Sequence, residues 1–185
     1  MSMRLVHAIG RAERSDDVHI ARLTLLLDAA AGRSGTQPVA GIMKLAKIDF
    51  LLRYPNCLER VLQKTRVAII DARIADYERS NIEAKMIRFR YGPWDSRYRR
   101  WIALLVAKGI AHTYITGRTV NIVITPAGHE VANILCHVPD LADLAVRSKL
   151  IQKAVGGMSA TRLKDFIYET FPELLDMRWG SEIEI

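Results

Sequence analysis

The stretch Ile82–Gly128, IEAKMIRFRYGPWDSRYRRWIALLVAKGIAHTYITGRTVNIVITPAG, contains the signals that decide the fold. Asp95 or Ser96 can cap a helix, because short polar side chains accept hydrogen bonds from the free N–H groups of a first turn. An apolar stripe at helical spacing follows, formed by Tyr98, Trp101, Ile102 and Leu105. Gly109 suits the left-handed residue just after a helix. The pattern therefore predicts a helix over 96–108.

Two β-prone segments follow this helix and are joined by Gly117-Arg118, which suits a tight turn. They predict a two-stranded hairpin, or wing, over 111–125. Thr125-Pro126 starts a helix predicted over 126–137, because proline suits the first helical position. A winged-helix domain presents its second helix and its wing in this order. We predict a mainly α fold with a small β-hairpin, in which 15–138 form a winged-helix-like core.

Two further helices precede this region. Polar residues at 15–17 can cap a helix predicted over 15–31. A second helix is predicted over 41–54, since its apolar residues recur at helical spacing and Pro55 disfavours helical geometry in the residue before it. The segment Val67–Asp71 is ambiguous, because its length and composition fit either a buried strand or part of a helix.

Appendages are expected on both sides of the core. They are a basic N-terminal arm over 1–14, C-terminal helices over 139–172 and an acidic tail over 173–185. The arm carries no apolar run long enough for a signal peptide or a membrane span. The last residues of the tail, EIEI (182–185), are acidic and are expected to be loose.

The chain is basic, and its charge is unevenly distributed. It has a formal net charge of +7 over 185 residues, and sixteen Lys and Arg oppose seven Asp and Glu between Lys44 and Arg118, a net charge of +9 there. Such a balance favours partners rich in phosphate or carboxylate, and no membrane partner is indicated. Two cysteines in apolar, helical surroundings, Cys57 and Cys136, fit a reducing compartment. We expect a cytoplasmic protein.

The basic residues around the predicted helix and wing are candidates for DNA contact, because guanidinium groups form charge-assisted hydrogen bonds with phosphate oxygens. They are Arg88, Arg90, Arg97, Arg99, Arg100, Lys108 and Arg118. We expect three of them, Arg97, Arg100 and Lys108, on the helix face opposite the apolar stripe. The same residues suit a solvated face or a protein-docking surface, and the sequence leaves this choice open.

The segment Tyr91-Gly92-Pro93-Trp94-Asp95 is interpreted as a structural corner rather than a ligand site. Its Gly and Pro fix the backbone, Trp94 buries a large apolar surface, and Asp95 can cap the next helix. Each residue of the segment thus has a structural role.

An enzymatic hypothesis rests on Asp71, Glu83 and Lys85. The segment Val67–Asp71 followed by Glu83-Ala84-Lys85 imitates the PD-(D/E)xK arrangement of nucleases, in which two carboxylates hold a divalent metal ion. The pattern is weak, because a Glu-x-Lys triplet is common by chance. His129-Glu130 lacks the second histidine of a zinc-binding H-E-x-x-H motif, and no glycine-rich nucleotide loop occurs, so we expect no metal ion and no cofactor.

Two segments carry a resemblance to a known family: Lys44–Pro55 (KLAKIDFLLRYP), and Met86–Asp95 (MIRFRYGPWD) with the helix and hairpin after it. They resemble the middle component of the three-component ABC-ATPase defence systems of bacteria, a group that includes the Lamassu-type anti-phage systems. The residues that carry the resemblance are Lys44, Lys47, Asp49, Tyr91, Gly92, Pro93, Trp94 and Asp95. The resemblance implies a small non-enzymatic subunit, without cofactor or small-molecule substrate.

The resemblance also implies two protein partners, an ATPase related to structural-maintenance-of-chromosomes (SMC) proteins and an effector that is often a nuclease. The expected function is therefore that of an accessory subunit in a complex directed against phage or plasmids, which docks on the ATPase and helps it to hold double-stranded DNA. A stand-alone winged-helix transcription regulator is the first alternative, and would need a dimer and an operator with two half-sites. The metal-dependent nuclease is the second.

Overall fold

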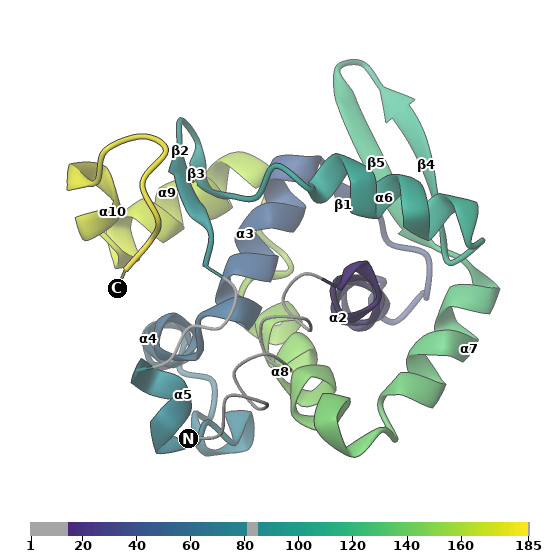
Figure 1. Cartoon of the computed structure of the whole chain (residues 1–185), viewed down its shortest axis with the longest axis horizontal. Helices are drawn as coiled ribbons and strands as arrows, with labels where there is room; N and C mark the ends of the chain where they lie inside the picture. The colour runs from purple at the N-terminus through teal and green to yellow at the C-terminus, as the bar shows by residue number, and fades with distance from the viewer. Residues whose placement is uncertain (1–14, 81–84, 185) are drawn as a thin grey trace.

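Helices dominate the fold, and small antiparallel sheets lie among them (Figure 1). The computed structural model describes residues 15–80 and 85–184, so the predicted arm over 1–14 lies outside the described residues. The helices are α2 (Asp16–Ala30), α3 (Ile42–Arg53), α4 (Pro55–Thr65), the 3₁₀ turn η1 (Ile70–Ala72), α5 (Asp76–Ser80), α6 (Tyr98–Ala107), α7 (Pro126–Leu135), α8 (Pro139–Val155), α9 (Ala160–Thr170) and α10 (Glu173–Asp176). The strands are β1 (Val39–Ala40), β2 (Ile87–Phe89), β3 (Gly92–Trp94), β4 (Ala111–Thr116) and β5 (Thr119–Ile124). The predicted class, mainly α with a small β-hairpin, is confirmed.

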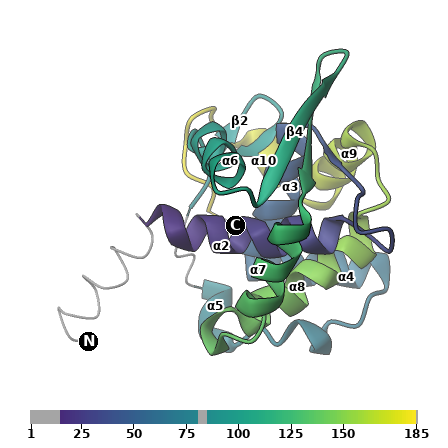
Figure 2. The same ribbon diagram turned by 90° about the vertical axis from the view of Figure 1, so that its right-hand side faces the viewer.

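Helix α2 lies at the centre of the molecule. Figure 1 looks along its axis, and Figure 2 shows it crossing the molecule between α6 on one side and α7 and α8 on the other. Asp16 and Asp17 occupy its first turn, where negative charge interacts favourably with the helix dipole. Leu23, Leu26 and Leu27 are buried, as is the charged Arg22. The helix is therefore surrounded by protein on nearly all sides.

The wing belongs to a three-stranded sheet in the order β1-β5-β4. Strand β4 pairs with β5 from Ala111↔Ile124 to Thr116↔Thr119, and β5 continues the sheet to β1 through Val39↔Ile122. Gly117 has a φ of +60° in the connecting turn, a conformation that glycine adopts without strain. The hairpin predicted over 111–125 is therefore observed.

The order α2, β1, α3, α6, β4, β5 is compatible with the predicted winged-helix-like core, into which residues 54–97 are inserted between α3 and α6. The inserted residues 54–97 contain α4, η1, α5 and the small β2–β3 sheet. Helix α6 begins at Tyr98 rather than at 96, and Arg97 occupies the N-cap position instead of Asp95 or Ser96. Asp95 instead accepts a hydrogen bond from the backbone N–H of Arg97 at 3.0 Å, which shapes the turn that leads into α6.

The ambiguous segment Val67–Asp71 is neither a strand nor a continuing helix. Helix α4 ends at Thr65, and the next residue, Arg66, is left-handed with a φ of +57°. The chain then forms the 3₁₀ turn η1, in which Ile70 is 87% exposed. The predicted alternatives are a buried strand and part of a helix, and an exposed 3₁₀ turn is neither.

The C-terminal part is ordered along its described length. Helices α8 and α9 agree with the helices predicted over 139–172. The tail over 173–185 contains α10 and then runs beside β2. There the backbone N–H of Ile183 donates to the carbonyl of Met86 at 2.8 Å, so the expectation that EIEI is loose is wrong for its described residues 182–184. Ile183 is fully buried, and its carbonyl accepts a hydrogen bond from the Tyr54 hydroxyl at 3.2 Å.

A continuous hydrophobic core joins the winged-helix elements to the insertion and to the C-terminal helices. Its largest fully buried side chains include Trp101 and Tyr98 of α6, Phe50 of α3, Tyr54 and Phe171. The insertion therefore packs as part of the same unit. Among the helices within 15–80 and 85–184, none has the length and apolar character needed to cross a membrane.

Candidate nucleic-acid interface

Helix α6 and the β4–β5 wing form a basic segment that contains no carboxylate. The wing projects from the body of the protein beside α6 (Figure 2). Between Ser96 and Thr125 the chain contains no Asp or Glu, whereas it contains five Lys and Arg. This segment therefore carries a formal charge of +5, a balance that favours an anionic partner.

Three of the predicted DNA-binding residues are exposed on this surface. Arg99 lies in the first turn of α6, Lys108 is the residue after the helix, and Arg118 lies in the turn of the wing. No carboxylate within the described part of the chain forms an ion pair with any of them. Their charges are therefore free to meet phosphate oxygens.

Two other candidates on α6 already have partners. Arg97 donates hydrogen bonds to Asp95 at 3.0 and 2.8 Å, and its guanidinium lies 4.8 Å from the ring centre of Trp101. Arg100 pairs with Asp16 of α2 at 2.6 Å, although its side chain is still 69% exposed. Arg97 is thus mainly structural, whereas Arg100 can meet a phosphate only in competition with Asp16.

The last two candidates lie elsewhere. Arg88, on β2, is 4% exposed; its side chain donates to the carbonyl of Leu174 and its guanidinium lies 5.3 Å from the ring centre of Tyr168. The prediction that Arg88 contacts DNA is therefore wrong, because its side chain points into the protein. Arg90 is exposed, but it lies at the β2–β3 turn beside Tyr168 of α9, apart from α6 and the wing (Figure 1).

Asp49 is the centre of a buried polar network that anchors α6. Its side chain is fully buried and accepts hydrogen bonds from Arg22 at 2.7 and 3.0 Å and from the Tyr98 hydroxyl at 2.6 Å. Burial opposes the ionised form, but the charges of Arg22 and Arg53 outweigh it, so the pKa of Asp49 lies below its usual value. A single carboxylate on α3 thereby holds both α2 and α6.

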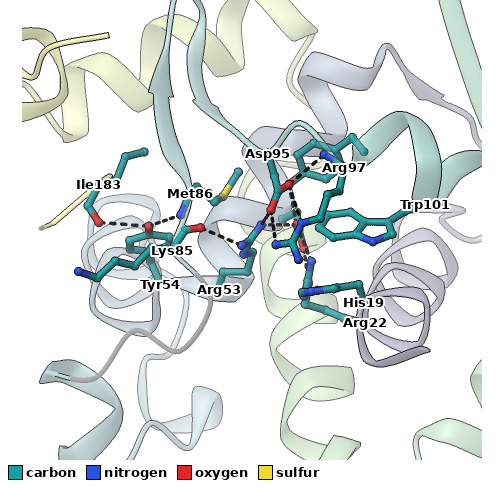
Figure 3. A network of polar contacts seen from close by, with 12 residues as sticks. His19, Arg22, Arg53, Tyr54, Lys85, Met86, Asp95, Arg97, Trp101 and Ile183 are labelled. Carbon is teal, nitrogen blue, oxygen red and sulfur yellow. Dashed lines mark hydrogen bonds and ion pairs between the residues drawn. The ribbon is translucent and has the colours of Figure 1, made fainter. Parts of the chain in front are cut away.

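Asp95 forms the second centre of this network, at the corner before α6. Figure 3 shows the Asp95 carboxylate between Arg53 and Arg97, with Arg22 and Trp101 close by. Arg53 approaches it to 3.1 Å from α3. Burial raises the pKa of Asp95, but the hydrogen bonds from Arg97 and the charge of Arg53 lower it by a larger amount. The resulting pKa of Asp95 is about 2. Asp95 therefore stays ionised in the folded protein.

Other residues of the segment Tyr91–Asp95, and Lys47 of α3, support the same corner. Gly92 has a φ of +116°, which disfavours other residues, and the Cε atom of Lys47 lies 3.6 Å from the position that a Cβ at Gly92 would take. Pro93 is buried, whereas Tyr91 is 46% exposed. Trp94 packs against Tyr98 of α6, with 5.3 Å between the ring centres. The interpretation of this segment as a structural corner agrees with these contacts.

Lys44 and Lys47 point from α3 into the protein. Lys44 donates to the carbonyl of Gly156, at the end of α8, at 3.2 Å. Lys47 is 2% exposed and donates to the carbonyl of Met43 at 3.1 Å. Burial, together with the nearby charge of Lys164, lowers the pKa of Lys47 to about 8. These residues connect elements of the fold rather than extend the basic surface.

The arrangement required by the nuclease hypothesis is not observed. Asp71 lies in the exposed turn η1 instead of at the end of a buried strand. Lys85 forms ion pairs with Glu184 at 2.7 Å and Glu182 at 3.4 Å, and Glu83 lies outside the described residues. No group of three or more His, Cys, Asp or Glu able to hold a metal ion occurs within 15–80 and 85–184.

The sequence interpretation missed a histidine contact on the opposite side of α2. His129 of α7 approaches Asp28 of α2 at 2.6 Å through Nδ1, and the carbonyl of Gly35 at 2.8 Å through Nε2. Both partners are acceptors, so both ring nitrogens act as donors in the protonated form, and the pKa of His129 is raised, mainly by the bond to Asp28. His129 and Asp28 also line a cleft of about 180 Å³ between α2, α7 and α8. Asp28 and His129 are 101 positions apart, and no sequence pattern connects them.

Comparisons with known proteins do not assign the chain to a family. No family model, no curated protein and no solved structure matches the chain.

Proposed function

We propose that this chain is a non-enzymatic accessory subunit that contacts double-stranded DNA through α6 and its wing. The observation that supports DNA contact best is the charge of this surface, where Arg99, Lys108 and Arg118 are exposed and no carboxylate lies between Ser96 and Thr125. Duplex DNA carries about one negative charge per 1.7 Å of axis, so each exposed cation can replace a condensed counterion there. Helices and their neighbouring loops commonly bind DNA through such phosphate contacts.

The buried network gives this proposal a mechanism. Asp49 and Asp95 bind α6 to α2, α3 and the corner, so the helix is already oriented before a ligand arrives. A preorganised surface loses little conformational entropy on binding. The cationic side chains therefore act at fixed spacing, while the family-motif residues keep them in place.

The protein partners in this proposal come from the sequence resemblance. The chain would work in the cytoplasm beside an SMC-like ATPase and an effector, in a complex directed against phage or plasmids. The gene neighbourhood, and co-expression with any SMC-like ATPase encoded there, test this part. A stable complex on size exclusion supports the accessory role, whereas a lone dimer bound to a palindromic operator would show a transcription regulator.

DNA contact is tested separately by charge reversal. The double variant Arg99→Glu, Arg118→Glu should weaken binding to a 20-base-pair duplex by roughly a hundredfold or more at low salt, because two phosphate contacts become repulsions. Arg90→Glu is the control, since it makes the same substitution on an exposed residue at the β2–β3 turn, with half the charge change of the double variant. If all three proteins bind the duplex equally, the α6–wing surface does not contact DNA.

A further inference from the structure

Strand β4 forms an open edge of the wing sheet. Within residues 15–80 and 85–184, the sheet order β1-β5-β4 leaves β4 with a neighbour on one side. Five of its six residues, His112–Thr116, are exposed, with Ile115 at 72% and Tyr114 at 44%. An exposed edge strand is a template on which another strand can pair.

The register shows which backbone groups are open. The N–H of Thr125 donates to the carbonyl of Ile110 at 3.0 Å, so that pair is hydrogen-bonded. Bonded pairs alternate along an antiparallel ladder, which assigns bonds to His112, Tyr114 and Thr116. A hydrogen bond on the other side of β5 supports this assignment. The carbonyl of Val120 accepts from the backbone N–H of Gly41, next to β1, so it points away from β4. The N–H and C=O groups of Ala111, Thr113 and Ile115 therefore point outward from the edge.

This edge lacks the usual protections against pairing. The sequence of β4, AHTYIT, contains no proline and no lysine, and its register with β5 runs without a bulge over all six pairs. Natural proteins commonly block an exposed edge with such features. A regular, uncharged edge with an exposed isoleucine is therefore well suited to accept a strand.

The surrounding charge identifies the kind of strand. Lys108 lies just before β4 and Arg118 just after it, and neither has a carboxylate partner within the described residues. A second copy pairing antiparallel through β4 would bring Arg118 of one copy toward Lys108 of the other, which is repulsive. A strand with carboxylates at both ends would instead form opposite-charge pairs there.

We propose that β4 binds an extended segment of a partner protein, which adds a strand to the wing sheet and carries Asp or Glu on both sides of a β-branched centre. Backbone hydrogen bonds to Thr113 and Ile115 hold the segment, and its carboxylates meet Lys108 and Arg118. Strand addition of this kind draws affinity from the main chain and specificity from side chains. The site lies on the edge of the wing and adds a protein-binding role to the proposed DNA contact.

The test uses the full chain and a fluorescein-labelled peptide, Glu-Glu-Thr-Val-Thr-Val-Glu-Glu, measured by fluorescence anisotropy. Thr113→Pro removes an outward N–H without removing a β4–β5 hydrogen bond, so proline is tolerable at this edge position. We expect Thr113→Pro to bind the peptide roughly tenfold more weakly or worse, and Thr113→Ala to bind it like the unmodified protein. The same peptide with every Glu replaced by Lys should also bind roughly tenfold more weakly or worse.

A second reagent leaves the protein unchanged. Methylating alternate backbone nitrogens of the peptide removes the donors that strand pairing needs, so this peptide should not bind. Equal binding by the methylated peptide, equal binding by the Lys peptide, or no binding by the Glu peptide would overturn the proposal. Dimerisation of the chain that Thr113→Pro abolishes would overturn it in favour of a second copy. If duplex DNA displaces the peptide and Thr113→Pro weakens DNA and peptide equally, the edge is a DNA site and the proposal fails.

The two proposals fail separately. Arg99→Glu should weaken DNA binding and leave peptide binding unchanged, because Arg99 lies on α6 and not beside the β4 edge. Thr113→Pro should weaken peptide binding and leave DNA binding unchanged.

Discussion

The hydroxyl of Tyr98 donates a 2.6 Å hydrogen bond to Oδ2 of Asp49, and this bond fastens the first turn of α6 to α3. Both side chains are fully buried. Burial and the neighbouring Asp49 charge raise the pKa of Tyr98 well above its usual value, so the hydroxyl keeps its proton and remains the donor. The orientation of the candidate DNA-binding helix thus depends on a contact made across the inserted residues 54–97.

Removing Asp49 should destabilise the fold strongly. Asp49→Ala leaves the buried Arg22 and Arg53 without their shared carboxylate, which costs about 3–5 kcal/mol in the free energy of unfolding. Tyr98→Phe removes one donor and should cost about 1–3 kcal/mol. Urea denaturation measures both, and Glu169→Ala at the exposed Lys64 pair is a control that should cost less than about 1 kcal/mol. Equal losses in all three variants would contradict the central role of Asp49.

Asp95 should make stability depend on pH at the acidic end. Its folded pKa of about 2 lies below the ordinary value of 3.8, so ionised Asp95 contributes stability above pH 4 that is lost as the pH falls towards 2. A pKa shift of this size corresponds to about 2 kcal/mol in the free energy of unfolding. Denaturation should show that the free energy of unfolding of the unmodified protein exceeds that of Asp95→Asn by this amount near pH 6, and by less near pH 2.5. A constant difference across this range would exclude the contribution.

His129 should make stability depend on pH in the opposite direction. Its pKa is raised by Asp28 and the Gly35 carbonyl, so the protonated ring contributes stability that is complete below the unfolded value of 6.5 and is lost as the pH rises through the folded pKa. The melting temperature of the unmodified protein should exceed that of His129→Gln at pH 5.5, and the gap should narrow at pH 8.5. His112→Gln, which removes an exposed imidazole from β4, is the control. A gap for His129→Gln that is the same at pH 5.5 and pH 8.5 would contradict the prediction.

The C-terminal tail should contribute to the stability of the whole fold. Ile183 is fully buried beside β2, so Ile183→Ala should cost about 2–5 kcal/mol in the free energy of unfolding. Glu184→Ala removes an exposed partner of Lys85 and should cost no more than about 1 kcal/mol. Chemical denaturation compares the two neighbouring substitutions. Equal small effects would mean that the tail is not packed in solution.

The sequence predicts the winged-helix elements well, because their boundaries carry local signals. Helix α7 starts at Pro126, with the Thr125 side chain accepting from Gly128 at 3.0 Å, and α6 is followed by Gly109 at a φ of +72°. Caps, prolines and glycines act over a few residues, so they are visible in one sequence. Val67–Asp71 has no such signals and forms a turn that composition did not indicate.

The candidate site is predicted less completely, because its geometry depends on contacts between distant residues. Arg99 and Arg118 are exposed as expected, but β2 turns Arg88 inward, where it fits among residues of the C-terminal part. Asp49 lies in a segment singled out by the sequence resemblance, whereas its partner Arg22 lies 27 residues earlier and carries no sequence signal. Which face of a short strand points inward is decided by the segments that pack against it.

The salt dependence of DNA binding tests the central claim most directly. Each phosphate contact contributes about 0.9 to the slope of log affinity against log salt concentration. Arg99→Ala and Arg118→Ala should therefore each reduce the slope by about 1, while Arg90→Ala should leave it unchanged. A measurable affinity for duplex DNA with these slopes is the predicted result. No affinity at low salt, or a slope that is the same in all four proteins, would contradict DNA contact through α6 and the wing.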